Sequence, residues 1–460
     1  MVRSCGQITG LPQSPQVSGR LEAFSSFQSL RRPSLRLPLV LDRLLWIALL
    51  VLPVSLYATP PPSRSDTPPP PKLEERIPVA PLGYRPPGQL YLLTRISSSS
   101  LDFIDSTRLL FTFHTAKLMK RERDAAWSDD DQMIHAVVLD LPGGQVDAAA
   151  DWRMHDRSRY IWPLGGGRFL VRQGNDYSTV DASLTLKQWL SSPTSVLATE
   201  VSPDGKLLVT EDEYERHTPE EHQKLVEEAN AAGITPPSED ALINLIDFDT
   251  KTVLGRIRVE MPAVVPVVRS GYLVHEESKD ASGYLIEFFP FGGKEVTLGS
   301  VRSTCQPRET FLNDQTAMIE SCGPNTADTF LDTWTIDGKR LWSGRRDGHA
   351  VWPTLALAQN GRRFAIGLLR VMREINLDDS LDDENVKEQV VQVFDVATGA
   401  LLVSVTASPI LSAGQNFALS SDGNHLAVLH DGAIEVYAVP SAPNTPNTPN
   451  APNTPGKKDK

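Results

Sequence analysis

Residues 201–210 read VSPDGKLLVT, and residues 243–259, after an intervening segment, read INLIDFDTKTVLGRIRV. Asp and Asn tolerate positive φ and Gly prefers it, so an Asp-Gly or Asn-Gly pair between two apolar runs turns the chain between antiparallel strands. Residues 357–367 (LAQNGRRFAIG) and 390–405 (VVQVFDVATGALLVSV) repeat the same order of strand, turn, strand, gap, strand, turn and strand. The pattern predicts a repeated four-stranded antiparallel unit.

Weaker copies of this unit fill the rest of the chain. A clear copy at residues 418–439 stops after its third strand, and less regular copies precede it. Units of roughly 40–55 residues have the period of propeller blades, and counting them gives about seven. The strands carry continuous apolar runs, as expected where neighbouring blades cover both faces of a sheet. We therefore predict an all-β fold, a single β-propeller of about seven four-stranded blades over residues 88–440.

The last unit lacks its fourth strand, and a strand near the N-terminus can supply it. Residues 88–96 (GQLYLLTRI) precede the first unit and belong to no hairpin of their own. Pairing them with residues 433–439 would close the ring and cover two edges that otherwise template aggregation. We predict that Gly88–Ile96 is the closing strand, with a stray strand on an open ring as the alternative.

Two elements carry a resemblance to a known family. SPDGKLLV (residues 202–209) and DVATGALLV (residues 395–403) resemble elements of the WD-repeat-like and YVTN-type β-propellers of exported bacterial proteins. The resemblance covers residues 88–440 and is clearest in the third, sixth and seventh units. It implies the propeller fold. It leaves the function open, because propellers include lyases, hydrolases, quinoproteins and pure scaffolds.

The N-terminal residues predict export. Arg31, Arg32 and Arg36 precede an apolar stretch whose uninterrupted part is Leu44–Ala58. This part is short for a membrane span of about 20 residues. A signal peptide over residues 1–58 fits the pattern, and an uncleaved inner-membrane anchor at residues 44–58 is the alternative. Both place the remaining chain in the periplasm or outside the cell.

Two segments outside the repeats have low-complexity compositions. Residues 59–87 begin with a proline-rich run and predict an extended linker. Residues 441–460 repeat Pro-Asn-Thr and contain almost no apolar side chains, so we expect a disordered tail.

The cysteines agree with export. Cys5 lies in the leader, which leaves Cys305 and Cys322. An even pair in an exported chain predicts a disulfide. A turn near Asp314 would place the two residues opposite each other on antiparallel strands.

Three insertions occupy the same slot, between the second and third strands of the first, third and sixth units. Because strands alternate in direction, all three emerge on the face that carries the links between blades, here called the insertion-bearing face. The turns at 204–205, 360–361 and 422–423 lie on the opposite face, here called the plain face. The second insertion also predicts a helix, with Thr218 as its N-cap and Pro219 at its first position. The insertions cover residues 118–132, 211–240 and 370–389.

The insertion-bearing face is rich in acidic residues. We consider three interpretations: a solvated charged surface, a surface for a basic protein partner, and a calcium site. The residue spacing and the glycine of an EF-hand are missing, which argues against calcium. The acidic residues that would form a binding face are Asp129, Asp130, Asp131, Glu211, Asp212, Glu213, Asp378, Asp379, Asp382, Asp383 and Glu384.

Catalytic signatures do not occur in the sequence. It has no G-x-S-x-G, no H-E-x-x-H and no sialidase-type Asp box. Gly165–Gly167 predicts a hairpin turn and not a phosphate cradle, since no helix follows. Trp162 and Trp352 each precede a proline and are expected to pack between blades, with a ligand-binding rim as the alternative. We predict no catalytic, cofactor-binding or metal-ligating residue; nine scattered histidines meeting over the channel would be the exception.

The formal net charge of −12 argues against non-specific binding of nucleic acid, which needs a basic face. The sequence favours a non-catalytic interaction or scaffold propeller of the cell envelope, which binds another envelope protein through the insertion-bearing face. The alternative is an envelope enzyme, lactonase-like or quinoprotein-like, with its site at the mouth of the channel. Convergence of carboxylates and histidines from several first strands would favour the enzyme.

Overall fold

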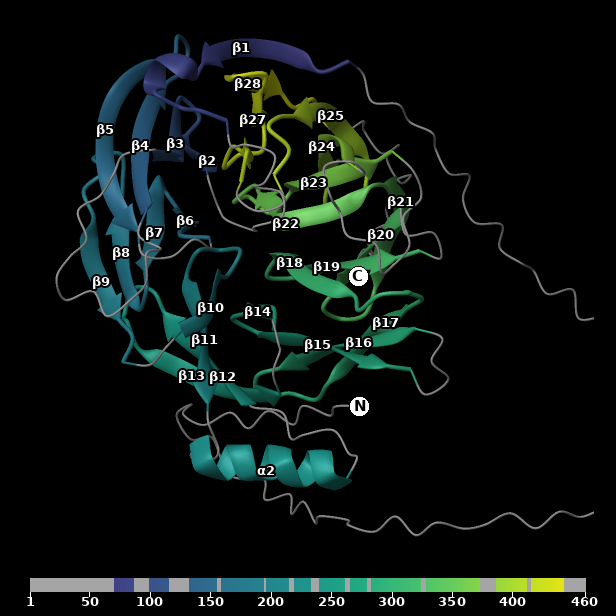
Figure 1. Cartoon of the computed structure of the whole chain (residues 1–460). Coiled ribbons are helices and arrows are strands. Elements are labelled where there is room, and N and C mark those ends of the chain that lie inside the picture. Colours follow the sequence, from purple (N-terminus) through teal and green to yellow (C-terminus); the bar gives the residue numbers. More distant parts are fainter. Residues whose placement is uncertain are drawn as a thin grey trace, which may run out of the picture. The chain divides into compact units, whose positions relative to one another are not determined.

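The computed structural model describes twelve segments of the chain, and within them the strands form seven four-stranded antiparallel sheets. Figure 1 shows these sheets arranged as the blades of a ring, with the first strand of each blade toward the centre. The predicted all-β propeller of about seven blades is confirmed. The described segments are residues 70–86, 99–115, 132–154, 159–193, 196–214, 219–232, 240–260, 265–278, 283–323, 328–372, 386–411 and 415–441.

Six blades use four strands that follow one another along the chain. Blade 1 contains β2 (Ser99–Asp105), β3 (Arg108–Thr115), β4 (Gln132–Asp140) and β5 (Gln145–Met154). Blade 2 contains β6 (Ile161–Gly165), β7 (Arg168–Gln173), β8 (Asp176–Val180) and β9 (Lys187–Ser191). Blade 3 contains β10 (Val196–Val201), β11 (Leu207–Tyr214), β12 (Asp240–Asp247) and β13 (Val253–Glu260).

The next three blades follow the same order. Blade 4 contains β14 (Val267–Val268), β15 (Gly271–Glu277), β16 (Tyr284–Pro290) and β17 (Val296–Val301). Blade 5 contains β18 (Arg308–Asn313), β19 (Thr316–Cys322), β20 (Asp328–Thr335) and β21 (Arg340–Asp347). Blade 6 contains β22 (His349–Leu357), β23 (Arg363–Val371), β24 (Val386–Asp395) and β25 (Leu401–Ala407).

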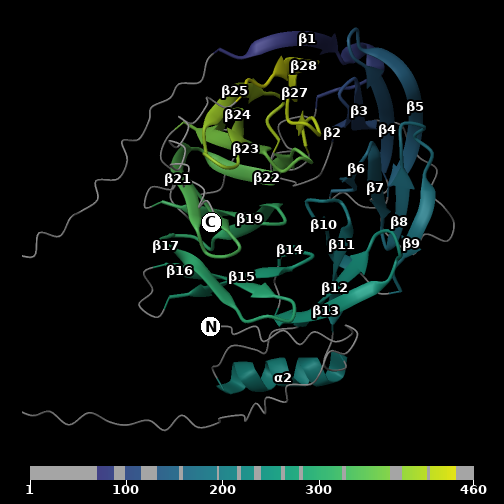
Figure 2. The same ribbon diagram turned by 180° about the vertical axis from the view of Figure 1, so that it is seen from behind.

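Blade 7 is built from both ends of the described chain. Its strands are β26 (Phe417–Leu419), β27 (His425–His430) and β28 (Ala433–Ala438), and β1 (Lys72–Pro78) is its outermost strand. Both views show β1 lying along β28 (Figures 1 and 2). Closure by an N-terminal strand is confirmed, but the prediction that Gly88–Ile96 supplies it is wrong. Residues 87–98 lie outside the described part of the chain.

The closing strand was missed because of its charge. In KLEERIP the only buried residue is Ile77, and the segment follows a proline-rich run. An outermost strand needs little apolar surface, because one long edge and much of one face meet water. Its polar residues bind instead: Arg76 Nη1 donates to Glu435 Oε1 of β28 at 2.6 Å, and Gly143 N of blade 1 donates to the Glu75 carboxylate.

The hairpin turns explain the Ser-x-Asp-Gly repeats. In blade 3, Ser202 Oγ donates to Asp204 Oδ1, and Leu207 N donates to Ser202 Oγ at 2.9 Å. Gly205 has a φ of +69°, and a Cβ there would lie 2.2 Å from the Leu164 carbonyl oxygen of blade 2. Only glycine satisfies both constraints. Blade 7 repeats the serine–aspartate pair with Ser420 and Asp422.

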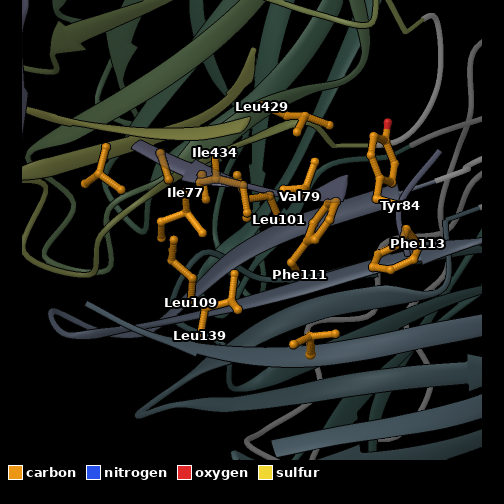
Figure 3. Close-up of a cluster of buried hydrophobic side chains, with 14 residues drawn as sticks. Ile77, Val79, Tyr84, Leu101, Leu109, Phe111, Phe113, Leu139, Leu429 and Ile434 are labelled. Atoms are coloured by element: carbon orange, nitrogen blue, oxygen red, sulfur yellow. The ribbon is translucent and has the colours of Figure 1, made fainter. Parts of the chain in front are cut away.

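Blades pack through apolar side chains, and the junction of blades 1 and 7 is the clearest example. Ile77, Leu101, Phe111, Leu429 and Ile434 are almost fully buried there and come from β1, β2, β3, β27 and β28 (Figure 3). Burial of each such side chain contributes about 1.5–3 kcal/mol. The contacts make the ring junction a core of its own.

A second connection joins blades 1 and 7 near the axis. Leu101 N donates to Gln415 O at 2.9 Å, and Gln415 N donates to Ser99 O at 3.0 Å. Residues 99–101 of β2 therefore continue the hydrogen-bonding pattern into the chain just before β26. The ring is closed both at its outer edge and beside the channel.

The helix predicted in the second insertion is present as α2 (Pro219–Ala232). Pro219 occupies its first position, as expected, and Ala229 is buried. In the described part of the chain, no helix has the length and hydropathy of a membrane span. The predicted leader (residues 1–58) lies outside the described residues, as do residues 442–460 of the predicted tail.

Candidate functional site

Charged residues from four blades meet around the channel. Asp102 lies on β2, Glu200 on β10 and Arg308 at the start of β18, while Arg159 comes two residues before β6. All four belong to first strands or to the link that enters one, and first strands surround the axis (Figure 1). We call these residues the axial charge cluster.

Asp102 is the most deeply buried member, with 5% of its surface exposed. Burial raises the pKa of its carboxyl to about 7, although a hydrogen bond from Ser100 and the charge of Arg159 act in the opposite direction. Ser100 Oγ donates to Asp102 Oδ2 at 2.8 Å. A carboxyl in this state exchanges its proton near neutral pH.

Glu200 is the second carboxylate of the cluster. Burial raises the pKa of its side chain, and the charges of Arg159 and Arg308 oppose this shift. Arg159 therefore acts on both carboxylates, from blade 2, and Arg308 acts on Glu200 from blade 5. Burial opposes ionisation of both acids, and the guanidinium groups favour it.

The arginines lie toward the insertion-bearing face, since each comes where its chain enters a first strand. Arg159 is half-buried, its Nε donates to Ile161 O at 3.1 Å, and its guanidinium carbon lies 5.4 Å from the centre of the Trp162 ring. Arg308 is exposed, and no described residue hydrogen-bonds its guanidinium. Arg308 is therefore the member that an outside ligand can reach.

Buried polar contacts hold the link that carries Arg159. The neighbouring Tyr160 is fully buried, and its hydroxyl lies 2.7 Å from Thr112 Oγ1 of blade 1. Arg172 N donates to Tyr160 O at 2.9 Å. Burial, together with the charge of Asp102, raises the pKa of the Tyr160 phenol, so it stays neutral and positions Arg159 without adding charge.

The predicted disulfide between Cys305 and Cys322 is confirmed, with a Cα–Cα distance of 5.5 Å. It ties the link before β18 to the end of β19, and so fixes the segment that leads into Arg308. In the same segment Gln306 Nε2 lies 3.0 Å from His275 Nε2, and His275 Nδ1 lies 2.8 Å from Glu309 Oε1. These contacts join blades 4 and 5 beside the cluster.

Two residues of the predicted acidic surface are buried in the structure. Glu211 and Asp212 are buried, because β11 continues through them and pairs with Ile243 and Leu242 of β12. Asn244 Nδ2 donates to Asp212 Oδ2 at 2.9 Å. Reading both as solvated loop residues was wrong, since the strand extends past its apolar run. Glu213 continues the same strand.

The remaining predicted residues have mixed outcomes. Trp162 is 3% exposed and packs between blades 2 and 3, as expected, and Gly165–Gly167 forms a hairpin turn. The side chain of Trp352 lies outside the description. Among the described residues, no three His, Cys, Asp or Glu side chains gather as a metal site. The predicted residues outside the described segments are Asp129, Asp130, Asp131, Asp378, Asp379, Asp382, Asp383 and Glu384.

The axial charge cluster was not predicted from the sequence. Its signal is present in LDFID and ATEVS, where a carboxylate interrupts the apolar run of a first strand. An acid there either faces the channel or needs a partner inside the blade. The arginines carry no such signal, because each lies in an irregular link.

No family model matches the chain, and no curated protein matches it. Among solved structures, an orthorhombic crystal form of the acylaminoacyl peptidase of Pyrococcus horikoshii is similar, with a TM-score of 0.42 and 10% identity over 69% of this chain and 53% of that one. The uncomplexed form of that enzyme has a TM-score of 0.41 and 10% identity, over 66% and 50%. The chain thus spans about half the length of the solved structures it matches.

Proposed function

We propose that this protein is an exported, non-catalytic binding propeller that engages another envelope protein through its insertion-bearing face. The axial charge cluster carries the proposal. Arg308 is exposed at this face, Arg159 is half-buried, both act on Glu200, and burial raises the pKa of Glu200 and Asp102. Such a site favours an acidic side chain or a terminal carboxylate, which a guanidinium binds with two parallel hydrogen bonds.

Two further observations support the setting. The Cys305–Cys322 disulfide is of the kind found in oxidising compartments outside the cytosol. The helix α2 provides an ordered element within an insertion, and ordered long insertions in compact domains are commonly functional. Together with the leader expected at residues 1–58, these features favour export.

The test reverses one charge at the axis and one at the rim of the same blade. Arg308→Glu should weaken capture of the partner from an envelope fraction at least tenfold, because the new carboxylate repels an acidic group and no longer donates hydrogen bonds. The matched control is Arg345→Glu, an exposed arginine on the outermost strand β21. If both variants fold and recover the same partners as the parent, the axial cluster is not the binding site.

An enzyme with its site in the channel is the second candidate, and Asp102 favours it. A buried carboxyl with a pKa of about 7 has the proton affinity that suits a general acid or base at neutral pH. Asp102 and Glu200 lie on two first strands and both interact with Arg159, although the cluster contains no histidine. Turnover of a lactone substrate that disappears in Asp102→Asn, with partner capture unchanged, would select the enzyme.

A further inference from the structure

A cavity of about 330 Å³ opens on the plain face, opposite the axial arginines. It is formed by the turns between first and second strands of blades 1, 2, 6 and 7 and by the turn after β8. Four blades on both sides of the ring junction thus contribute to one pocket, here called the plain-face pocket. Its lining residues are Ile104, Asp105, Arg108, Gly166, Gly167, Asp181, Ala182, Gln359 and Ser421.

Close approaches between turns fix the walls of the plain-face pocket. A Cβ on Gly165 would lie 3.1 Å from Gln359 Nε2 of blade 6, and a Cβ on Gly167 would lie 3.1 Å from Ile104 O of blade 1. The three consecutive glycines, with φ between +61° and +84°, allow the blade 2 turn to fit between these neighbours. The pocket is therefore a product of the closed ring.

The charges in the plain-face pocket are already neutralised by protein partners. Arg108 Nε and Nη2 donate to Asp105 Oδ2 at 2.9 and 2.7 Å. Burial opposes ionisation of Asp105, but the hydrogen bonds from Arg108 and Thr107 outweigh it and lower the pKa. Hydrogen bonds from Ser183 lower the pKa of Asp181, whose Oδ2 lies 3.6 Å from Lys187 Nζ.

Uncharged hydrogen-bonding groups remain available in the same pocket. No described residue hydrogen-bonds the Gln359 amide or the Ser421 hydroxyl, and no described acceptor receives the N–H of Gly166 or Gly167. Ile104 and Ala182 add apolar surface beside them. Because Arg108 is paired with Asp105 and Asp181 with Lys187, the described lining of the pocket offers no unpaired charge to a charged ligand.

We propose that the plain-face pocket binds a neutral saccharide of one or two rings. Hydroxyl groups in a fixed ring arrangement use donors and acceptors together, which the Gln359 amide and the Ser421 hydroxyl supply. The apolar faces of a sugar ring match Ile104 and Ala182. The cavity has the size at which small-ligand sites begin, and this sets the upper limit of about two rings.

The experiment uses the full chain, with glucose and maltose as neutral probes and gluconate and glucosamine as charged ones. Saturation-transfer NMR and calorimetry should detect saturable binding of a neutral probe. Ala182→Phe fills the pocket and should abolish that binding. Gln359→Ala removes one ligand hydrogen bond and should raise Kd about tenfold. Gln315→Ala, an exposed glutamine in the matching turn of blade 5, is the control and should leave Kd unchanged.

Several results would overturn the proposal. These are binding of the charged probes alone, binding of no probe, or equal binding by the parent and Ala182→Phe. If Ala182→Phe fails to fold, judged by its circular dichroism melt, Gln359→Ala decides. The pocket lies on the face opposite Arg308, so partner capture should be unaffected by either variant, and failure here leaves the proposed function standing.

Discussion

Blades 5 and 7 are both four-stranded sheets, but their strands come from different parts of the chain and are held together by different contacts. Blade 5 takes its four strands from one continuous stretch, and a disulfide joins the link before its first strand to the end of its second strand, across a separation of 17 residues. Blade 7 takes three strands from the end of the propeller and one from its beginning, and Arg76 and Glu435, which join them, lie 359 residues apart. Stabilisation is local in blade 5, whereas in blade 7 it holds the whole ring.

From this difference we expect that loss of a contact in blade 7 destabilises the whole ring, whereas loss of a contact in blade 5 destabilises that blade alone. The entropy of closing a loop grows only slowly with its length, so the long separation in blade 7 adds little extra cost. What changes is the number of residues that depend on the contact. Blades 1 and 7 share the core around Ile77 and Leu101, and both lose it when the ring opens.

The largest effect is expected from removal of β1. Deletion of residues 70–79 should lower the free energy of unfolding by about 5 kcal/mol or more, because Ile77 leaves the core, Glu435 loses Arg76 and the edge of β28 is exposed. Denaturant melts measure the loss. Deletion of residues 60–69, equal in length, is the control and should change little. Equal melts for the two deletions would contradict the assigned role of β1.

A smaller, pH-dependent effect is expected from Asp102→Asn, beside the inner connection of blades 1 and 7. The folded-state pKa of Asp102, about 7, lies above its unfolded value near 4, so stability falls as pH rises between these values and is level above. Asn does not titrate. At pH 8 the variant should be more stable by up to about 4 kcal/mol, and the difference should vanish toward pH 4.

Asp422 provides the control for that experiment. Burial opposes its ionisation, but hydrogen bonds from Ser420 and Asn424 outweigh it and lower the pKa, so the folded state favours the charged form. Asp422→Asn should therefore destabilise the protein at neutral pH and have less effect as pH falls. Denaturant melts of both variants across the pH range measure whether each substitution raises or lowers the free energy of unfolding. A difference for Asp102→Asn that does not change with pH would contradict the raised pKa.

The smallest of the three effects is expected in blade 5. Cys305→Ser should lower the free energy of unfolding by about 3 kcal/mol, the value for a closed loop of this size. Hydrogen exchange should accelerate in residues 302–323 and stay unchanged in blade 7. Ser343→Ala, at an exposed position on β21 of the same blade, is the control. Accelerated exchange around the whole ring would show that the disulfide of blade 5 stabilises all blades, as the contacts of blade 7 are expected to do.

The sequence predicts what local chemistry determines. The turns around Gly205 and Gly423, the helix α2 and the Cys305–Cys322 pair each depend on residues close in sequence, and all were anticipated. The closing strand depends on a partner at the other end of the chain, and its single buried residue, Ile77, gives almost no periodic signal. For such an element, pairing partners and not composition decide the structure.

The two sites also depend on contacts between residues far apart in sequence, which local sequence patterns do not reveal. Asp102, Arg159, Glu200 and Arg308 come together only because seven blades point their first strands at one axis. The plain-face pocket likewise depends on turns of blades 1, 2, 6 and 7 meeting across the junction. The fate of Glu211 and Asp212 depended on how far β11 continues, and a run of charges after apolar residues leaves that end point open.

The position of β1 in the sequence also determines when blade 7 can form during synthesis. Its residues leave the ribosome before those of any blade, while their partners in β28 follow 359 residues after Arg76. At about 5–20 residues per second, the wait is on the order of 20–70 s. During that time blades 1 to 6 can pair internally, but the first and last blades lack a neighbour. A nascent or partly translocated chain therefore exposes both unfinished edges to chaperones and proteases, and completion of the C-terminal strands ends that exposure in a single step.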